Sequence, residues 1–342
     1  MKSRFLRTCW REQADATAVW YMRQAGRYLP GYREIRKTHG VLDIARSPEL
    51  AVQVALEPVR TLGVDAAILF ADIALPLQAM GFPIDIERDV GPVTTSPVRA
   101  PDDVERLKEF DPALVPFIPE TIGRLKEKLN GVPLIGFCGA PYTLASYMIE
   151  GRPTKDFAET KAFMWRHPDA WDALLERLAD GMGAYLGVQT KAGADAVQVF
   201  DSWVGALSPD DYLARVARPT ARLFRSVRET GVPAIHFGTG TATILPLMRE
   251  AGGEVLAVDW RLPLDEAWAR AGDQVALQGN LDPAALLAPP KVIEEKVRDI
   301  LARAAGRPGH IFNLGHGVLP GTPVEHARLV VERVHAMTAG GA

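Results

Sequence analysis

The residues best suited to bind an anion lie in one stretch, Val19–Lys37. It has five cations and one anion, a net charge of +4, in a chain whose formal net charge is −3. Tyrosines are interleaved, and glycines and a proline interrupt any continuous helix before Tyr32. Because arginine donates paired hydrogen bonds to a carboxylate and keeps its charge when desolvated, we expect a loop in which Arg23 and Arg27 converge on an anionic ligand. An ordinary solvated basic surface is the alternative.

A second set of polar residues follows short apolar runs. Asp72 comes just after Phe70, and similar residues follow the later runs. If the runs are strands of a barrel, their carboxyl ends share the face that carries the chemistry. The residues expected around one cavity are Asp72, Ser202, His236, Asp259, Asn280 and His316. Each has a structural alternative, since Asp259 could pair with Arg261 and His236 could be a satisfied core histidine.

Several standard chemistries do not fit these residues. No apolar run ends in the lysine that a Schiff-base enzyme needs, and the GxSxG motif of a nucleophile elbow is absent. His310 and His316 have no cysteine close by in sequence, which disfavours a zinc site. An aspartate, a histidine, hydroxyls and an arginine loop suit electrostatic and acid–base catalysis on a polyanion.

The composition fits a globular protein of 342 residues, 47% hydrophobic and 24% charged. A pI near 6.2 gives no general attraction to nucleic acid or to a membrane surface. The two cysteines, Cys9 and Cys138, do not make a disulfide framework. The charged N-terminal segment lacks the apolar core of a secretory signal, so we expect a cytoplasmic protein without membrane spans.

Apolar runs alternate with amphipathic segments along the whole chain, without an evident linker. The runs that predict buried parallel strands are Ala66–Phe70, Pro133–Phe137, Ala196–Phe200, Ala234–Phe237, Val255–Val258, Val275–Gln278 and His310–Leu314. An eighth strand is expected inside Ala18–Met22 or in a segment without a clear pattern. The predicted helices are Pro48–Leu62, Pro101–Phe110, Pro116–Leu129, Thr143–Glu150, Pro168–Lys191, Pro209–Thr230, Leu245–Ala251, Pro263–Ala271, Pro283–Ala305 and Pro323–Met337.

Capping signals support several of these helices. A Ser, Asp or Thr precedes a proline at Ser47, Ser208, Asp282 and Thr322. The segment Pro83–Pro101 predicts an inserted hairpin with its turn at Gly91-Pro92. The alternation favours a single (β/α)8 TIM barrel over 1–342. A doubly wound sheet is the alternative, weakened because no GxGxxG follows the first strand.

Three segments resemble signatures of the uroporphyrinogen decarboxylase family. Met22–Pro30, MRQAGRYLP, resembles the N-terminal signature. Gly136–Leu144 followed by Tyr147–Gly151 resembles the second, and Asn313–Val318 with the downstream prolines and His326 resembles the third. The resemblance covers nearly the whole chain, because the spacing between the segments also fits.

The resemblance implies a homodimeric, cytosolic barrel enzyme of haem biosynthesis that uses neither a metal nor an organic cofactor. Such enzymes convert the four acetate side chains of uroporphyrinogen III to methyls, giving coproporphyrinogen III and four CO2. The implied substrate contacts are Arg23, Gln24, Ala25, Gly26, Arg27, Arg36, Asp72, Tyr147, Ser202 and His316. The implied catalytic residues are Asp72, Arg23 and Arg27. Asp259 and Asn280 lie in a region without a residue-by-residue match.

The chemistry of this substrate fits those residues. Arginines can neutralise its carboxylates, and Asp72 can accept hydrogen bonds from its inward-pointing pyrrole N–H groups. An ionised Asp72 would also stabilise the cation formed when a ring carbon is protonated. An arginine of the loop, or a water that it holds, is the expected proton donor, with Tyr147 and His316 as alternatives.

Two other functions fit part of the pattern. A related corrinoid or thiol methyltransferase would need a zinc-binding cysteine set that Cys9 and Cys138 do not supply. A non-catalytic tetrapyrrole-binding protein would need the arginines but not Asp72.

Overall fold

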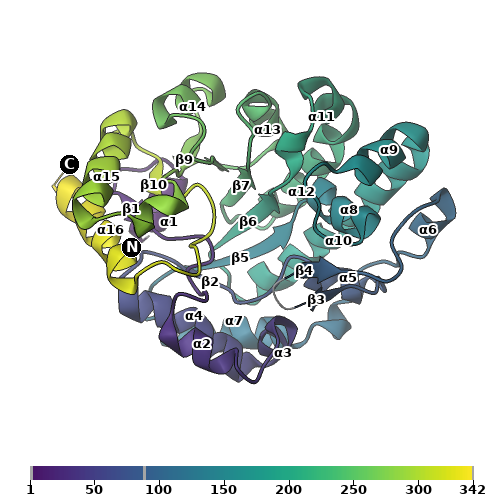
Figure 1. The fold of residues 1–342 in the computed structure, drawn as a ribbon, viewed down its shortest axis with the longest axis horizontal. Coiled ribbons are helices and arrows are strands. Elements are labelled where there is room, and N and C mark those ends of the chain that lie inside the picture. The colour runs from purple at the N-terminus through teal and green to yellow at the C-terminus, as the bar shows by residue number, and fades with distance from the viewer. Residues whose placement is uncertain (1–2, 88–89, 341–342) are drawn as a thin grey trace.

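The computed structural model describes residues 3–87 and 90–340, and its centre is a curled parallel sheet (Figure 1). Within these residues the sheet has eight strands in the order β1-β10-β9-β8-β7-β6-β5-β2, and each neighbouring pair is parallel. The strands are β1 Ala18–Val19, β2 Ala67–Ile68, β5 Leu134–Gly139, β6 Ala196–Asp201, β7 Ala234–Gly238, β8 Val255–Ala257, β9 Ala276–Gln278 and β10 His310–Phe312. All seven predicted strands are confirmed, and the eighth lies inside Ala18–Met22 as expected.

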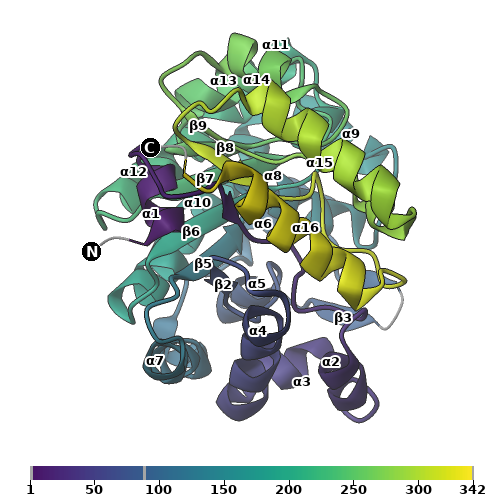
Figure 2. The same ribbon diagram turned by 90° about the vertical axis from the view of Figure 1, so that its left-hand side faces the viewer.

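The helices surround this sheet, as both ribbon views show (Figures 1 and 2). The helices up to residue 150 are α1 Arg4–Cys9, α2 Pro30–Ile35, α3 Val41–Arg46, α4 Pro48–Leu62, α5 Leu75–Ala79, α6 Pro101–Glu105, α7 Phe117–Lys128 and α8 Pro141–Glu150. The others are α9 Ala158–Arg166, α10 Pro168–Lys191, α11 Pro209–Arg215, α12 Ala217–Arg228, α13 Leu245–Ala251, α14 Leu264–Ala271, α15 Pro290–Ala304 and α16 Val324–Thr338. This alternation of strand and helix is the (β/α)8 barrel architecture.

The first and last strands of the sheet order, β1 and β2, meet through Asp65. The Asp65 N–H donates to the Val19 carbonyl at 2.7 Å, and the Val19 N–H donates back to Asp65 Oδ2 at 2.7 Å. Arg4 and His335 also contact this carboxylate, at 2.8 and 2.7 Å, and they come from α1 and α16. Figure 2 shows these two helices on the same side of the molecule. Asp65 therefore links the N-terminal and C-terminal helices to the point where β1 and β2 meet.

Some helix predictions are confirmed and others are corrected. The Ser47 and Ser208 side chains cap α4 and α11 by accepting from Leu50 N and Asp211 N. Pro209–Thr230 is wrong as one helix, because it breaks at Val216 into α11 and α12. Pro283–Ala305 is likewise divided into a 3-10 turn and α15, and Pro101–Phe110 is helical only to Glu105.

The prediction that no continuous helix precedes Tyr32 is confirmed for residues 20–29, but α2 begins at Pro30, so Pro30 and Gly31 lie inside a helix instead of breaking one. Proline at the first helical position loses no hydrogen bond, so it starts this helix instead of preventing it. The predicted Thr322 cap is wrong too, since Pro323 occupies the cap position of α16.

The inserted hairpin is confirmed, but its predicted turn is wrong. Asp85–Glu87 (β3) pairs antiparallel with Gly91–Val93 (β4), so Gly91-Pro92 begins a strand. Proline is tolerated in a two-stranded ribbon, where each strand has a free edge. Residues 88 and 89, which belong to the predicted hairpin segment Pro83–Pro101, lie outside the described residues.

Candidate active site

A cavity of about 1040 Å³ lies at the carboxyl ends of the strands. Nine of the ten predicted substrate contacts line it: Arg23, Ala25, Gly26, Arg27, Arg36, Asp72, Tyr147, Ser202 and His316. Its size is at the upper end for small-molecule sites, which suits a large ligand. The apolar lining includes aromatic residues that the sequence did not single out as contacts, among them Tyr32, Phe137, Phe200, Trp203 and Trp260.

Buried polar contacts stabilise the loop that carries Arg23 and Arg27, called here the arginine loop. The tenth predicted contact, Gln24, is fully buried, and its side chain accepts from Tyr21 N at 3.1 Å and donates to the Ala66 carbonyl at 3.0 Å. Gln24 therefore supports the loop, and its side chain faces the core instead of the cavity. At the end of the loop, Glu57 of α4 accepts from the N–H groups of Gly31 and Tyr32 at 2.7 and 2.9 Å, which caps α2.

Arg23 is placed at the cavity by an unusual backbone. Its φ of +57° lies in the left-handed region, which non-glycine residues seldom adopt. Its side chain lies against Gly317, where an added Cβ would stand 2.6 Å from Arg23 Cγ. The glycine after His316 therefore leaves the space that Arg23 occupies. On the same loop, Arg27 is exposed, and Arg36 donates to the His39 carbonyl.

Asp72 follows β2 and is enclosed by protein, although part of its surface is open to the cavity. The Ala74 N–H donates to its Oδ1 at 2.8 Å. Burial raises the pKa of this carboxyl, while the hydrogen bond from Ala74 and the charge of Arg23 act in the opposite direction. A ligand that donates hydrogen bonds to the carboxylate would further favour its charged form.

Tyr147 and Trp203 form an aromatic wall of the cavity. Their ring centroids are 4.0 Å apart, and the ring centroids of Phe157 and Trp203 are 5.0 Å apart. Burial and the nearby charge of Asp72 raise the pKa of Tyr147, so its hydroxyl stays protonated and can donate to a carboxylate. Ser202 precedes Trp203, and its carbonyl accepts from Thr239 Oγ1 at 2.6 Å.

His316 is neutral at physiological pH. Burial, together with the charge of Arg23, lowers its pKa to about 4. The Gly317 N–H donates to Nδ1 at 2.7 Å, so Nδ1 is an acceptor and the proton of the neutral ring is on Nε2. Nε2–H of His316 can therefore donate a hydrogen bond into the cavity.

Three strand-end residues expected around the cavity do not line it. His236 is fully buried on the helix side of β7, where its ring lies 4.7 Å from that of Phe224. Asp259 accepts from the N–H groups of Gly240 and Arg261, and it pairs with the Arg261 side chain, as the structural alternative had it.

Asn280 likewise has a structural position. Its amide donates to the Asp259 and Leu262 carbonyls at 2.9 and 2.6 Å. Asn280 and Asp259 thereby fix the loop that presents Trp260 to the cavity.

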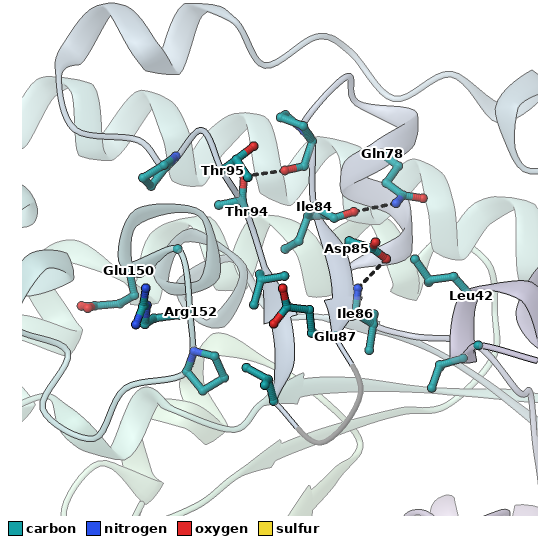
Figure 3. Close-up of a pocket in the computed structure, with 18 of the residues that line it drawn as sticks. Leu42, Gln78, Ile84, Asp85, Ile86, Glu87, Thr94, Thr95, Glu150 and Arg152 are labelled. Carbon is teal, nitrogen blue, oxygen red and sulfur yellow. Dashed lines mark hydrogen bonds between the residues drawn. The ribbon is translucent and has the colours of Figure 1, made fainter. Parts of the chain in front are cut away.

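A second cavity, of about 1190 Å³, lies beside the β3–β4 hairpin (Figure 3). The two cavities adjoin, because both are lined by Val41, Ile86, Glu87, Val90 and Pro153. Glu150 and Arg152 lie on one side of the hairpin and Leu42 on the other in this view. The second cavity contains none of the strand-end residues, which is why we place the chemistry in the first.

Residues 3–87 and 90–340 contain no group of three or more His, Cys, Asp or Glu side chains placed to hold a metal ion. No helix in the part of the chain that the structure describes is long and apolar enough to cross a bilayer.

A (β/α)8 barrel whose strand ends surround arginines and a half-buried aspartate defines a class of barrel enzymes that bind anionic small molecules. Comparison with known proteins narrows the class. Residues 1–337 match the family model described as uroporphyrinogen decarboxylase (URO-D). The chain belongs to the uroporphyrinogen decarboxylase family.

Curated relatives agree with this assignment. The chain is 51% identical over 341 residues to the uroporphyrinogen decarboxylase of Chloroflexus aurantiacus, covering 98% of this chain and 96% of that protein. It is 50% identical to the enzyme of the same name from Sorangium cellulosum, covering 98% and 97%. Among solved structures, a methyltransferase from Methanosarcina mazei has a TM-score of 0.78 at 20% identity, covering 98% of this chain and 99% of that one. That likeness supports the barrel fold alone.

Proposed function

We propose that this chain decarboxylates the four acetate side chains of uroporphyrinogen III, giving coproporphyrinogen III and four CO2, without a metal or organic cofactor. The observation that carries the proposal is one cavity lined by Asp72 together with Arg23, Arg27, Tyr147 and His316. The curated relatives of the same name support it.

Binding rests on charge and hydrogen bonding. Arg23, Arg27 and Arg36 neutralise carboxylates at the edge of the macrocycle. Ser202, the Tyr147 hydroxyl and the His316 Nε2–H donate to other carboxylate oxygens, while the backbone at Ala25 and Gly26 allows close approach. Asp72 lies deeper and accepts the pyrrole N–H groups, since a carboxylate offers about four acceptor sites.

Each decarboxylation replaces one carboxylate with one proton. Protonation of the pyrrole α-carbon next to the carbon that bears the acetate makes a cationic ring. The electron pair of the breaking C–CO2 bond then forms an exocyclic C=C bond to the acetate-bearing carbon, which neutralises the ring. A proton then reaches the exocyclic carbon as the pyrrole α-carbon loses its own, and a methyl group results. The ionised Asp72 stabilises the cationic ring; a comparable electrostatic contact is worth roughly 3–4 kcal/mol of barrier.

A water held by Arg23 or Arg27 is the proposed proton donor. The pKa of His316, lowered to about 4, leaves little imidazolium at neutral pH, and the raised pKa of Tyr147 makes it a weak acid. Arginine itself is a poor acid because of its high pKa.

The proposal extends to assembly and location. We propose one barrel domain over 1–342, a homodimer, and a cytoplasmic enzyme without nucleic-acid or membrane partners. The family resemblance supports these points, and light scattering coupled to size-exclusion chromatography would test the dimer.

The test is anaerobic incubation of purified, chelator-treated protein with uroporphyrinogen III. We expect CO2 release and stepwise loss of four carboxyls, seen by chromatography after oxidation to porphyrins. Tight binding without CO2 would favour the tetrapyrrole-binding alternative. Loss of activity on chelation would contradict the cofactor-independent reaction.

A further inference from the structure

One buried hydroxyl links the two elements that make the aromatic wall. Thr143, in α8, is fully buried. Its Oγ1 donates to Asp201 Oδ1 at 2.9 Å and accepts from the backbone N–H of Trp203 at 3.3 Å. The hydroxyl therefore donates a hydrogen bond to the last residue of β6 and accepts one from the loop that follows this strand.

The position of Thr143 in its helix couples this link to Tyr147. Residues four apart on a helix lie on the same face, one turn from each other. Fixing Thr143 thus fixes the rotation of α8 that presents Tyr147 to the cavity. Trp203, whose N–H is held by the same hydroxyl, has its ring centroid 4.0 Å from that of Tyr147. A single side chain therefore holds both members of the wall.

Asp201 is a buried anchor for this hydroxyl. Its side chain is fully buried and is absent from the cavity lining, so it does not touch a ligand there. Its Oδ2 lies 3.9 Å from His236 Nε2 and makes no hydrogen bond within the described residues. Burial and the charge of Asp201 raise the pKa of Tyr212 and Tyr142, so both remain protonated around the carboxylate. The Thr143 hydroxyl is the donor that holds Asp201 Oδ1.

We propose that Thr143 and Asp201 are positioning residues: through one shared hydroxyl they set the place of Tyr147 and Trp203 against the substrate. This inference rests on the proposed function. The hydroxyl of Tyr147 is the group that the link delivers to a substrate carboxylate. Because small displacements of positioning groups are costly, loss of the link should reduce turnover while the barrel remains folded.

The test compares two substitutions at one site with a matched control elsewhere. Thr143→Val removes the hydroxyl with little change of shape, and Thr143→Ser keeps it. Thr121→Val makes the same change at a buried α7 threonine whose hydroxyl has no hydrogen-bond partner within the described residues. Anaerobic decarboxylation kinetics and thermal unfolding would be measured for each. We expect kcat/KM to fall about 10- to 100-fold in Thr143→Val and to stay within about threefold of wild type in the other two.

A double-mutant cycle with Tyr147→Phe separates positioning from a general structural role. If Thr143 acts through the Tyr147 hydroxyl, Thr143→Val should cost much less activity in the Tyr147→Phe background. Equal losses in both backgrounds, or wild-type kinetics in Thr143→Val, would overturn the inference. If wild-type protein releases no CO2 from the substrate, the proposed function fails. If the wild type is active and Thr143→Val matches it, only the positioning role fails.

Discussion

The replacement Asp72→Asn tests the centre of the proposed mechanism. It conserves shape, and the amide oxygen can still accept from the Ala74 N–H that now donates to Asp72 Oδ1 at 2.8 Å. What changes is the charge, together with the acceptor capacity of the second oxygen, because an amide nitrogen donates. That nitrogen would oppose the pyrrole N–H groups of the substrate.

The size of the effect follows from the surroundings of the carboxylate. Two unit charges about 4 Å apart interact by about 4 kcal/mol at an effective dielectric constant near 20. The opposed charge of Arg23 reduces the net field at the ring. We therefore expect kcat to fall about 10²- to 10³-fold, the range found when a preorganised electrostatic contact is removed.

The assay is anaerobic turnover under saturating uroporphyrinogen III, with product porphyrins separated by chromatography. Asp282→Asn is a matched control. Asp282 lines the same cavity, and its Oδ1 accepts from an N–H two residues ahead, from Ala284 at 2.9 Å. The control should keep kcat within about threefold. Equal kcat in Asp72→Asn and wild type would refute the reasoning.

The same substitution should stabilise the free protein at neutral pH. Because burial raises the pKa of Asp72 above its unfolded value, the native state binds more protons between the two values. The free energy of unfolding therefore falls as pH rises through that window. Asn does not ionise, so Asp72→Asn should not lose this stability. Thermal unfolding of Asp72→Asn at pH 7 should give a Tm above that of wild type, and a lower Tm would contradict the raised pKa.

Three further predictions concern groups around the cavity. Burial lowers the pKa of His316 from 6.5 to about 4, so between these pH values the unfolded chain binds more protons than the native protein does. The free energy of unfolding therefore rises with pH across this window. His316→Gln should flatten that rise, as measured by thermal unfolding at several pH values. Gly317→Ala should displace the Arg23 side chain and raise KM about tenfold or more. The Tm should change little, because Arg23 is exposed. An unchanged KM would count against a binding role for this arginine. Glu57→Gln should weaken the cap of α2, which lowers the free energy of unfolding in urea by about 1 kcal/mol and raises KM severalfold. Wild-type kinetics in this variant would show that the cap does not position the loop that carries Arg23 and Arg27.

The helix ends show how far local sequence reaches. Ser47 and Ser208 were identifiable as caps because a cap needs only its own side chain and an N–H three residues later. The break at Val216 and the strand at Gly91-Pro92 were not identifiable. These depend on how α11, α12 and the hairpin pack, which the local pattern does not contain.

The sequence by itself determined the barrel and most of the cavity. Its alternation of apolar runs and helices predicts a parallel sheet, whose carboxyl ends share one face and so gather Asp72, Ser202 and His316. Only the tertiary structure decided which other strand-end residues face inward. Strands buried on both faces read as continuous apolar runs, without the alternation that would tell the cavity side from the helix side. For that reason His236 was expected in the cavity yet lies behind it, and the Thr143–Asp201 contact, 58 residues apart in sequence, appears only once the chain has folded.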